Sequence, residues 1–238
     1  MRPAAHFLSL AALAAILVPV LEIAATAAQQ PTFVEEFRLL TIPDAVSPAG
    51  VPRQVAPRQY LAQAEGGQRE ADRLWQQGVE QFNRSQFREA IATWEQVLTL
   101  ARETGSRRGE GLVLNALGAA YRSLSQYEQA ITRHEAALEI AREIGDRAGE
   151  GRALGSLGIA YDSLGQYERA IDLHEQDLAI AREIGDRAGE GAALGNLGNA
   201  YNNLGNYERA IDLHQQNLAI AREIGDRAGE GRALERRS

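Results

Sequence analysis

The chain of 238 residues contains no cysteine. This absence excludes disulfide bonds, thiolate zinc sites, cysteine nucleophiles and a lipid anchor on an N-terminal cysteine. Aromatic residues are also scarce, at 6% of the chain against 45% hydrophobic residues in total. A core must therefore consist mainly of Ala, Leu and Ile, which suits closely packed helices better than a β-sandwich rich in β-branched and aromatic residues. We expect an all-α fold.

A surplus of basic residues is lacking as well. The chain has 25 Lys and Arg against 32 Asp and Glu, a formal charge of -7. Nucleic-acid binding needs clustered basic residues, whereas here Arg alternates with Glu and Asp, as on a solvated helix face. The motifs HExxH and GxSxG and the Walker loop are absent too. We therefore expect no nucleic-acid partner, no enzyme, no cofactor and no metal.

The N-terminal segment 1–27 is predicted to be a signal peptide. Arg2 supplies a positive charge, residues 7–20 form an apolar run, and residues 25–27 (Ala-Thr-Ala) suit a signal peptidase. The alternative is a membrane anchor, but the run is short of the roughly 20 residues that span a bilayer, and Glu22 follows it. We expect cleavage, a periplasmic or secreted protein, and no stable membrane insertion.

Residues 28–67 are predicted to be a flexible linker. Proline fixes φ and removes a hydrogen-bond donor, so a segment rich in it favours an extended chain over a helix. The prolines are Pro31, Pro43, Pro48, Pro52 and Pro57. Inside the linker, residues 33–42 form an apolar cluster. This cluster is either a small docking segment or the remnant of a leader.

From about residue 68 the chain repeats itself with a constant period. The units are 71–110, 111–150, 151–190 and 191–230, with a partial fifth unit at 231–238. The third and fourth units differ at 8 of their 40 positions, by direct comparison of their sequences. A period of this length predicts a stacked array of small structural units, a solenoid.

Each unit is predicted to be a pair of helices, A and B. In the third unit Asp146 should cap the start of helix A, Gly165 should end it, and Gly185 should end helix B, which runs over about 166–184. Helix A has one apolar face, comprising Ala153, Leu154, Leu157, Gly158, Tyr161 and Leu164. Helix B has two apolar stripes: Tyr167, Ala170, Ile171, His174, Leu178 and Ala181, and then Leu173, Ile180 and Ile184. Two stripes predict two neighbouring helices, as in a solenoid.

The spacing Leu157-Gly158-x-x-Tyr161, with Ala170 twelve residues after the glycine, resembles a tetratricopeptide repeat. The 40-residue unit, with Leu-Gly-Asn-Ala-Tyr at 197–201, is similar to the long-repeat subfamily of kinesin light chain, the LGN/Pins adaptors and many bacterial proteins. The resemblance implies a right-handed α-solenoid of antiparallel helix pairs. It also implies a non-enzymatic scaffold that binds an extended peptide or a protein surface in a concave groove lined by the A helices.

Three further expectations follow from this resemblance. The glycines Gly118, Gly158 and Gly198 and the alanines Ala130, Ala170 and Ala210 should let helices A and B approach closely, while Tyr127, Tyr167 and Tyr207 should wedge under helix A. The first unit departs from the repeat at Gln77 and Gln81 and should act as an N-terminal cap. Some bacterial relatives carry a CHAT-type peptidase-like domain, and that activity does not carry over to this chain.

The predicted groove rests on differences between units. Units three and four differ in helix A at five positions: Arg152/Ala192, Ser156/Asn196, Ile159/Asn199, Asp162/Asn202 and Ser163/Asn203. These positions fall within an arc of roughly 120° opposite the apolar face. Amide side chains there could bond an extended peptide backbone. The predicted groove residues are Asn115, Arg122, Arg152, Ser156, Asp162, Asn196, Asn199, Asn202 and Asn203. The alternatives are drift at exposed positions and, for Asn196, a structural bond to the next repeat.

His134, His174 and His214 recur at the same position of the second, third and fourth units. They lie in the apolar stripe of helix B, and repeats stack about 10 Å apart, too far to share one metal ion. We expect core histidines.

The fifth unit breaks off after the first residues of its helix A. We therefore expect Leu213, Ile220 and Ile224 to be uncovered, and a homodimer could bury them. An alternative is that the chain is the truncated regulatory arm of a larger effector.

Overall fold

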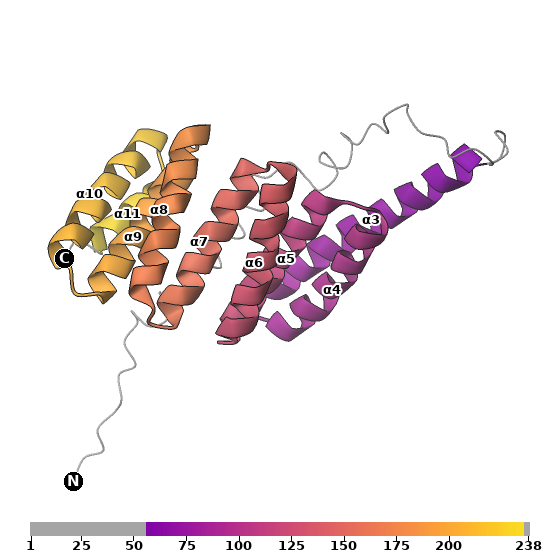
Figure 1. Cartoon of the computed structure of the whole chain (residues 1–238), viewed down its shortest axis with the longest axis horizontal. Helices are drawn as coiled ribbons and strands as arrows, with labels where there is room; N and C mark the ends of the chain where they lie inside the picture. The colour runs from indigo at the N-terminus through magenta and orange to yellow at the C-terminus, as the bar shows by residue number, and fades with distance from the viewer. Residues whose placement is uncertain (1–55, 236–238) are drawn as a thin grey trace, which may run out of the picture. The chain divides into compact units, whose positions relative to one another are not determined.

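The computed structural model describes residues 56–235, and it describes side-chain burial over 67–231. Every regular element in this range is an α-helix (Figure 1). The predicted signal peptide, the linker up to residue 55 and its apolar segment 33–42 lie outside the described residues. Contacts divide the chain into two compact units, the first ending at Thr93 and the second beginning at Trp94.

The first unit holds helix α3 (Ala56–Asn83) and the start of α4 (Phe87–Glu103). Because α3 begins at Ala56, the linker prediction is wrong for residues 56–67. Pro57 is the second residue of the helix, where the absent N–H would have had no partner within the helix.

The Gln81 side chain, which departs from the repeat, has a local partner in this unit. Its Oε1 accepts a hydrogen bond of 2.8 Å from the hydroxyl of buried Thr93. At the equivalent positions of the next repeat, the Arg133 guanidinium lies 5.9 Å from the ring centroid of Tyr121. A hydrogen bond therefore takes the place of a cation–π contact, and both residues of the pair change together.

The second unit is an array of antiparallel helix pairs. The A helices are α5 (Arg107–Ser123), α7 (Arg147–Ser163) and α9 (Arg187–Asn203), and the B helices are α6 (Tyr127–Ile144), α8 (Tyr167–Ile184) and α10 (Tyr207–Ile224). The short helix α11 (Arg227–Glu235) packs on α10. Each B helix contacts its own A helix and, in α6 and α8, the A helix of the next repeat, as the two apolar stripes predicted.

The predicted caps are confirmed. Asp146 Oδ1 accepts from the Gly149 amide at 2.9 Å, and Asp186 does the same for Gly189 at 2.8 Å. Gly185 adopts a left-handed φ of 72° at the end of α8. The capping carboxylate lies so close to Gly149 that a Cβ there would be 2.7 Å from Asp146 Oδ2. A side chain on Gly149 would therefore displace the capping carboxylate.

The turn from helix A to helix B uses one left-handed residue. Gly165 has φ +74° and Gly205 has φ +87°, while Ser125 occupies the same position of the second repeat with φ +59°. The prediction that helix A ends at Gly165 is confirmed.

One apolar cluster runs through two repeats. It joins α7 to α10 and includes Leu157, Ile171, Leu194, Leu197 and Leu213, each at most 7% exposed. Ile171 on α8 is thus buried in the same cluster as Leu194 and Leu197 of the following helix. Each repeat completes its core with side chains of its neighbour.

The predicted uncovered stripe at the end of the array is wrong for two of its three members. Leu213 is 3% exposed and Ile220 is 5% exposed. Ile220 of α10 packs against the A helix of its own repeat, because a Cβ on Gly191 of α9 would be 3.3 Å from Ile220 Cγ2. Ile224 is exposed, but so are Ile144 and Ile184 at the same position of earlier repeats.

Three further apolar side chains of the fourth repeat are exposed. Leu204, Tyr207 and Ile211 are 41%, 64% and 38% exposed. Tyr127 and Tyr167 are half-buried, so the expected wedge under helix A is wrong for Tyr207. The end-to-end homodimer stays a prediction, and of the three residues on which it was based only Ile224 is exposed.

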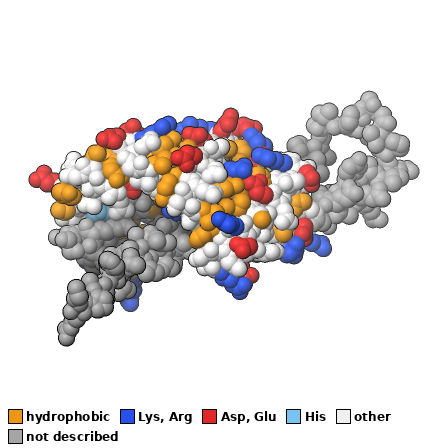
Figure 2. Space-filling view, turned by 90° about the horizontal axis from the view of Figure 1, so that it is seen from below, with side chains coloured by type: hydrophobic (Ala, Val, Ile, Leu, Met, Phe, Trp, Pro, Cys, Tyr) orange, Lys and Arg blue, Asp and Glu red, His pale blue; other side chains and the backbone are white. Residues whose placement is uncertain are grey.

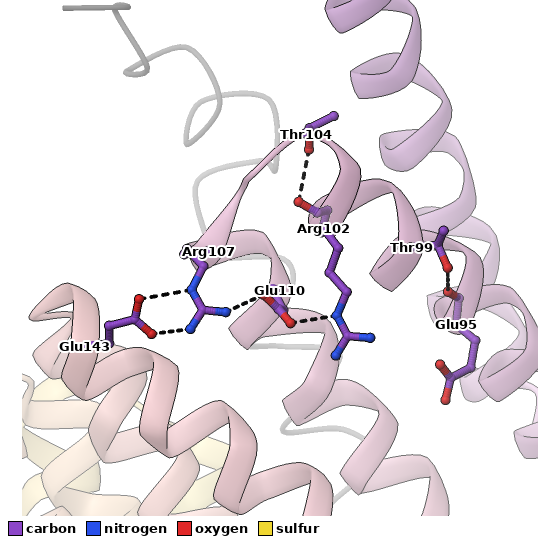
Figure 3. Close-up of polar contacts among 8 residues, drawn as sticks. Glu95, Thr99, Arg102, Thr104, Arg107, Glu110 and Glu143 are labelled. Atoms are coloured by element: carbon purple, nitrogen blue, oxygen red, sulfur yellow. Dashed lines mark hydrogen bonds and ion pairs between the residues drawn. The ribbon is translucent and has the colours of Figure 1, made fainter.

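Charged side chains link consecutive repeats in one recurring arrangement. In Figure 3, Arg107 lies between Glu110 and Glu143 while Arg102 reaches Glu110 from the other side. Arg102 Nε is 2.8 Å from Glu110 Oε1, and Arg107 Nη1 is 2.6 Å from Glu110 Oε2. The next two repeats use Arg142, Arg147, Glu150 and Glu183, and then Arg182, Arg187, Glu190 and Glu223.

The central glutamate of each arrangement is buried, with Glu190 8% exposed. Hydrogen bonds from Arg182 and Arg187 lower the pKa of Glu190, against a burial effect that raises it. The glutamate therefore stays ionised between its two arginines.

Candidate functional site

The nine predicted groove residues all lie on the A helices, where each is exposed or half-buried. We call these nine positions the A-helix surface. The helices that carry them approach one another: α5 contacts α7 and α7 contacts α9 more extensively than consecutive B helices contact each other. The helix A positions that differ between the third and fourth repeats are thus accessible on α7 and α9, while the apolar face of each helix is buried. At two of these positions the second repeat has Ala116 and Ala119, which are buried.

Two residues of the A-helix surface bond to each other across repeats. The Asn203 side-chain amide donates to the Asp162 carboxylate, with Nδ2 3.0 Å from Oδ1 and 3.3 Å from Oδ2. Burial raises the pKa of Asp162, and the hydrogen bond from Asn203 opposes that rise. The surface is therefore continuous from α7 to α9.

Asn115 has a structural role that the sequence did not reveal. Its Oδ1 lies 2.6 Å from Nδ1 of buried His134. An amide oxygen accepts, so the imidazole carries its proton on Nδ1. Burial, helped by the charge of Arg122, lowers the pKa of His134 to about 3. This histidine is therefore neutral, and the side-chain oxygen of Asn115 accepts a hydrogen bond from the core.

The histidines are buried, as predicted. Each imidazole lies against the glycine of its own helix A: Cβ atoms on Gly118 and Gly198 would be 2.7 Å from Nδ1 of His134 and His214. Residues 56–235 contain no group of three His, Asp or Glu side chains that could hold a metal ion.

A depression lies between α5, α6 and α7, and two residues of the A-helix surface, Asn115 and Arg152, are in its lining. Its apolar lining comes from Leu112, Ala137, Ile140, Ala141 and Ile144, its polar lining from Arg108, Asn115, Asp146 and Arg152, and Gly111 and Gly149 complete it. Arg108 Nε is 3.4 Å and Arg152 Nη2 is 3.8 Å from Asp146 Oδ2. Two guanidinium groups thus face the carboxylate of Asp146.

Arg108 and Asp146 were missed as candidate site residues. Asp146 was predicted only as a helix cap, and that role does not indicate that it also lines the depression. Arg108 has a signal in the sequence, because the other repeats have Ala148, Ala188 and Ala228 at this position. Arg108 lies in the first unit, while the two units whose differences define the predicted groove both have alanine at this position.

The third repeat fills the equivalent space with its own carboxylate. Asp177 replaces Ala137, and its Oδ1 and Oδ2 would be 3.1 Å and 2.7 Å from Cβ atoms on Gly151 and Gly155. Burial, and then the charge of Asp186, raise the pKa of Asp177 to about 7. In the fourth repeat Asn217 takes this position, with Oδ1 3.3 Å from a Cβ on Gly191.

Acidic and basic side chains mix on the face drawn in Figure 2, with apolar side chains between them. Neither sign dominates this face. Among the described helices, none combines the length and the apolar character needed to cross a membrane.

Three solved structures similar to this chain contain related arrays. Aspartyl phosphate phosphatase F from Bacillus subtilis has a TM-score of 0.66 at 19% identity, over 70% of this chain and 44% of that one. A Rap protein complexed with Competence and Sporulation Factor has a TM-score of 0.60 at 17% identity, over 70% and 47%. A variant of a putative kinesin light chain of Podosopora anserina, with nearly identical TPR-like repeats, has a TM-score of 0.53 at 22% identity, over 88% and 96%.

The chain thus spans less than half the length of the phosphatase and of the Rap protein. No curated protein matches it. Tetratricopeptide repeat families match residues 78–143, 110–183 and 193–228. These segments cover most of the helical array, and its paired antiparallel helices agree with them. The chain belongs to the tetratricopeptide repeat family.

Proposed function

We propose that this chain is a non-enzymatic adaptor that binds an extended peptide or a protein surface on its A-helix surface. The observation that supports this proposal most directly is the location of the differences between repeats. At the five helix A positions where repeats three and four differ, every side chain is accessible, whereas the leucines and alanines of the opposite face are buried. Drift at exposed positions would also vary them, so binding must be measured.

The chemistry of the surface supports a polypeptide partner. Asn196, Asn199, Asn202 and Asn203 lie along one side of α9, two half-buried and two exposed. An amide can donate to and accept from a peptide backbone at the same time. The structurally similar Rap protein was solved in complex with Competence and Sporulation Factor, which agrees with a binding role for such arrays.

The test begins by selecting peptides that bind the full chain from a random displayed library. A quadruple variant then gives α9 the residues of α7: Asn196→Ser, Asn199→Ile, Asn202→Asp and Asn203→Ser. We expect it to weaken binding of a selected peptide by about tenfold or more. Its melting temperature should fall only slightly, because the third repeat already uses these residues and the one bond lost is the exposed hydrogen bond from Asn203 to Asp162. Gln216→Ala on α10 is the control. Unchanged affinity in the quadruple variant would contradict the proposal.

We further propose that this binding takes place outside the cytoplasm, because residues 1–27 read as a signal peptide. Fusing alkaline phosphatase, which is active after export, to the C-terminus would test this. Activity that persists after deletion of the segment 1–27 would rule it out.

A further inference from the structure

We infer that the groove between α8 and α10 is a binding site for an arginine side chain of a polypeptide partner. Helix α9 forms the floor of this groove with Leu194, Leu197 and Tyr201. These residues belong to the apolar face of α9, opposite the A-helix surface, so the site is separate from the surface proposed above. The groove has a volume of about 300 Å³, near the lower end of the range for ligand pockets, which suits one long side chain.

The chain itself shows how such a groove holds an arginine, between the B helices α4 and α6. Arg133 Nη2 of α6 is 2.9 Å from Glu95 Oε1 of α4. The same guanidinium lies 5.9 Å from the ring centroid of Tyr121 on α5. One arginine thus joins a carboxylate to an aromatic ring, and a planar guanidinium can form both contacts at once.

The groove between α8 and α10 has the carboxylate and the ring but a different third residue. Two repeat periods along the chain, Glu175 corresponds to Glu95 and Tyr201 corresponds to Tyr121. Both line the groove. The position of Arg133 is taken by Leu213, which is buried and carries no charge. The two groups that contact a guanidinium in the second repeat are therefore present here without the arginine that joins them.

The third repeat covers its tyrosine with another arginine. The Arg169 guanidinium lies 4.3 Å from the ring centroid of Tyr161, and this tyrosine is only 6% exposed. Arg209 corresponds to Arg169 and lines the groove. Among the residues that the structure describes, however, no arginine lies over the ring of Tyr201, which is half-buried. The second and third repeats each place their own arginine at this tyrosine, and in the fourth repeat a partner would supply it.

The charged residues at the groove leave one carboxylate for a partner. Arg182 also lines the groove, but its Nε is 2.8 Å from Glu190 Oε1, so its charge is already compensated. Glu175 is exposed and has no ion-pair partner within residues 67–231. Arg209 opposes an incoming arginine, so its removal should improve binding.

The apolar side chains favour an arginine of a polypeptide over a small cation. Leu178, Leu197 and Leu213 are buried in the lining and offer contact to the methylene groups of an arginine. A small cation lacks these groups. A lysine ammonium cannot stack on the ring as a plane.

The probe is the tripeptide Gly-Arg-Gly, blocked at both ends. Its control is the same peptide with citrulline, which has nearly the same shape and no charge. The full chain is titrated with each peptide, and the ring resonances of Tyr201 are followed by NMR. We expect the arginine peptide to bind about tenfold more tightly than the citrulline peptide, with its side-chain methylene resonances shifted by the ring. Added salt should weaken the binding, because exposed charges are screened.

Single substitutions test each contact. Glu175→Gln and Tyr201→Leu should each weaken binding of the arginine peptide about fivefold. Arg209→Gln introduces the residue found at 129 in the second repeat and should strengthen binding about twofold to threefold. The matched control is Glu135→Gln, at the same position of the preceding groove, which should change nothing because Arg169 already covers the tyrosine there.

A double variant fills the groove from within the chain. Leu213→Arg with Arg209→Gln recreates the pair Arg133 and Gln129 of the second repeat and should abolish binding of the arginine peptide. Its melting curve shows whether it folds. If it does not fold, Glu175→Gln at its exposed position still decides the question.

Equal affinity for the arginine and citrulline peptides would overturn the inference. Unchanged binding in both Glu175→Gln and Tyr201→Leu would overturn it too, and so would a loss of binding in Glu135→Gln as large as in Glu175→Gln. The quadruple α9 variant should bind the arginine peptide normally, because its asparagines lie on the opposite side of α9. Failure of that variant to alter binding of a selected peptide bears on the proposed function alone.

Discussion

The imidazole of His174 occupies the space that a side chain on Gly158 would need. A Cβ on that glycine would be 2.7 Å from both ring nitrogens, closer than such atoms pack. Helix A approaches helix B at the glycine, and the buried histidine fills the space between them. The pair recurs as Gly118 with His134 and as Gly198 with His214.

Gly158→Ala should destabilise the chain by about 1–3 kcal/mol through overpacking, and His174→Ala by about 2–4 kcal/mol through the cavity it leaves. In the double variant the new methyl group enters that cavity, so the combined loss should be smaller than the sum. Urea denaturation of all four proteins measures this coupling. Strictly additive losses would mean that the two residues do not share the space.

Ser125→Gly should stabilise the chain by about 1 kcal/mol, because Ser125 holds a left-handed φ of 59° that disfavours residues with a Cβ. The third and fourth repeats already have glycine at this turn. The control is Ser123→Gly, in the last turn of α5, which should destabilise instead. A lower melting temperature for Ser125→Gly would show that the serine side chain stabilises the turn.

Asp177→Asn should stabilise the chain above pH 7 by about 1–3 kcal/mol. Burial raises the folded-state pKa of Asp177 to about 7, above its unfolded value of about 4. The folded chain therefore binds more protons between these two values, and this carboxylate lowers stability as pH rises through that window. The gain from the substitution should shrink steadily as the pH is lowered toward 4.

His174 changes the pH dependence of stability in the opposite direction over much of this range, because burial lowers its pKa to about 4. Its neutral folded form loses stability as pH falls below about 6.5. Comparing Asp177→Asn with the unaltered chain at each pH cancels that contribution. A gain that does not change between pH 5 and pH 8 would contradict the raised pKa of Asp177.

Glu150→Gln should lower the melting temperature by about 2–4 °C, since the amide replaces an ionised acceptor between Arg142 and Arg147. Calorimetry at low and high salt checks this, and the difference should diminish at about 1 M salt as the charges are screened. Glu175→Gln, at an exposed position on α8, is the matched control. An equal effect of both substitutions would assign the loss to net charge.

The sequence predicted the features that recur in the third and fourth repeats. Asp146 as a cap, Gly165 and Gly185 as helix ends, and the buried His174 all depend on local geometry that one repeat period displays. The identity of the surface-lining helix A residues followed from their variation. These parts of the fold need no knowledge of which helix packs on which.

The predictions were wrong where a residue's role depends on which other residues pack against it. Ile220 was assigned to an outward stripe, but Gly191 leaves room for it against its own A helix. Helix α3 includes Pro57 in its first turn, although the sequence treated this proline as a helix breaker. The role of Asn115 depends on His134, far along the chain, and the depression depends on Arg108, which differs from the alanine of the later repeats.

The junctions that lead into α7 and α9 have the same capping aspartate and the same arrangement of arginine and glutamate, so these two junctions are chemically interchangeable. Duplicating or deleting one whole repeat block would bring an acid opposite a base again, with the capping aspartate and its glycine still in register. Recombination between the repeats of the gene can therefore add or remove one repeat, and the residues at the new contact between repeats would still match. Selection can then change the length of the array one repeat at a time. The length of the partner segment that the array can bind would change with it.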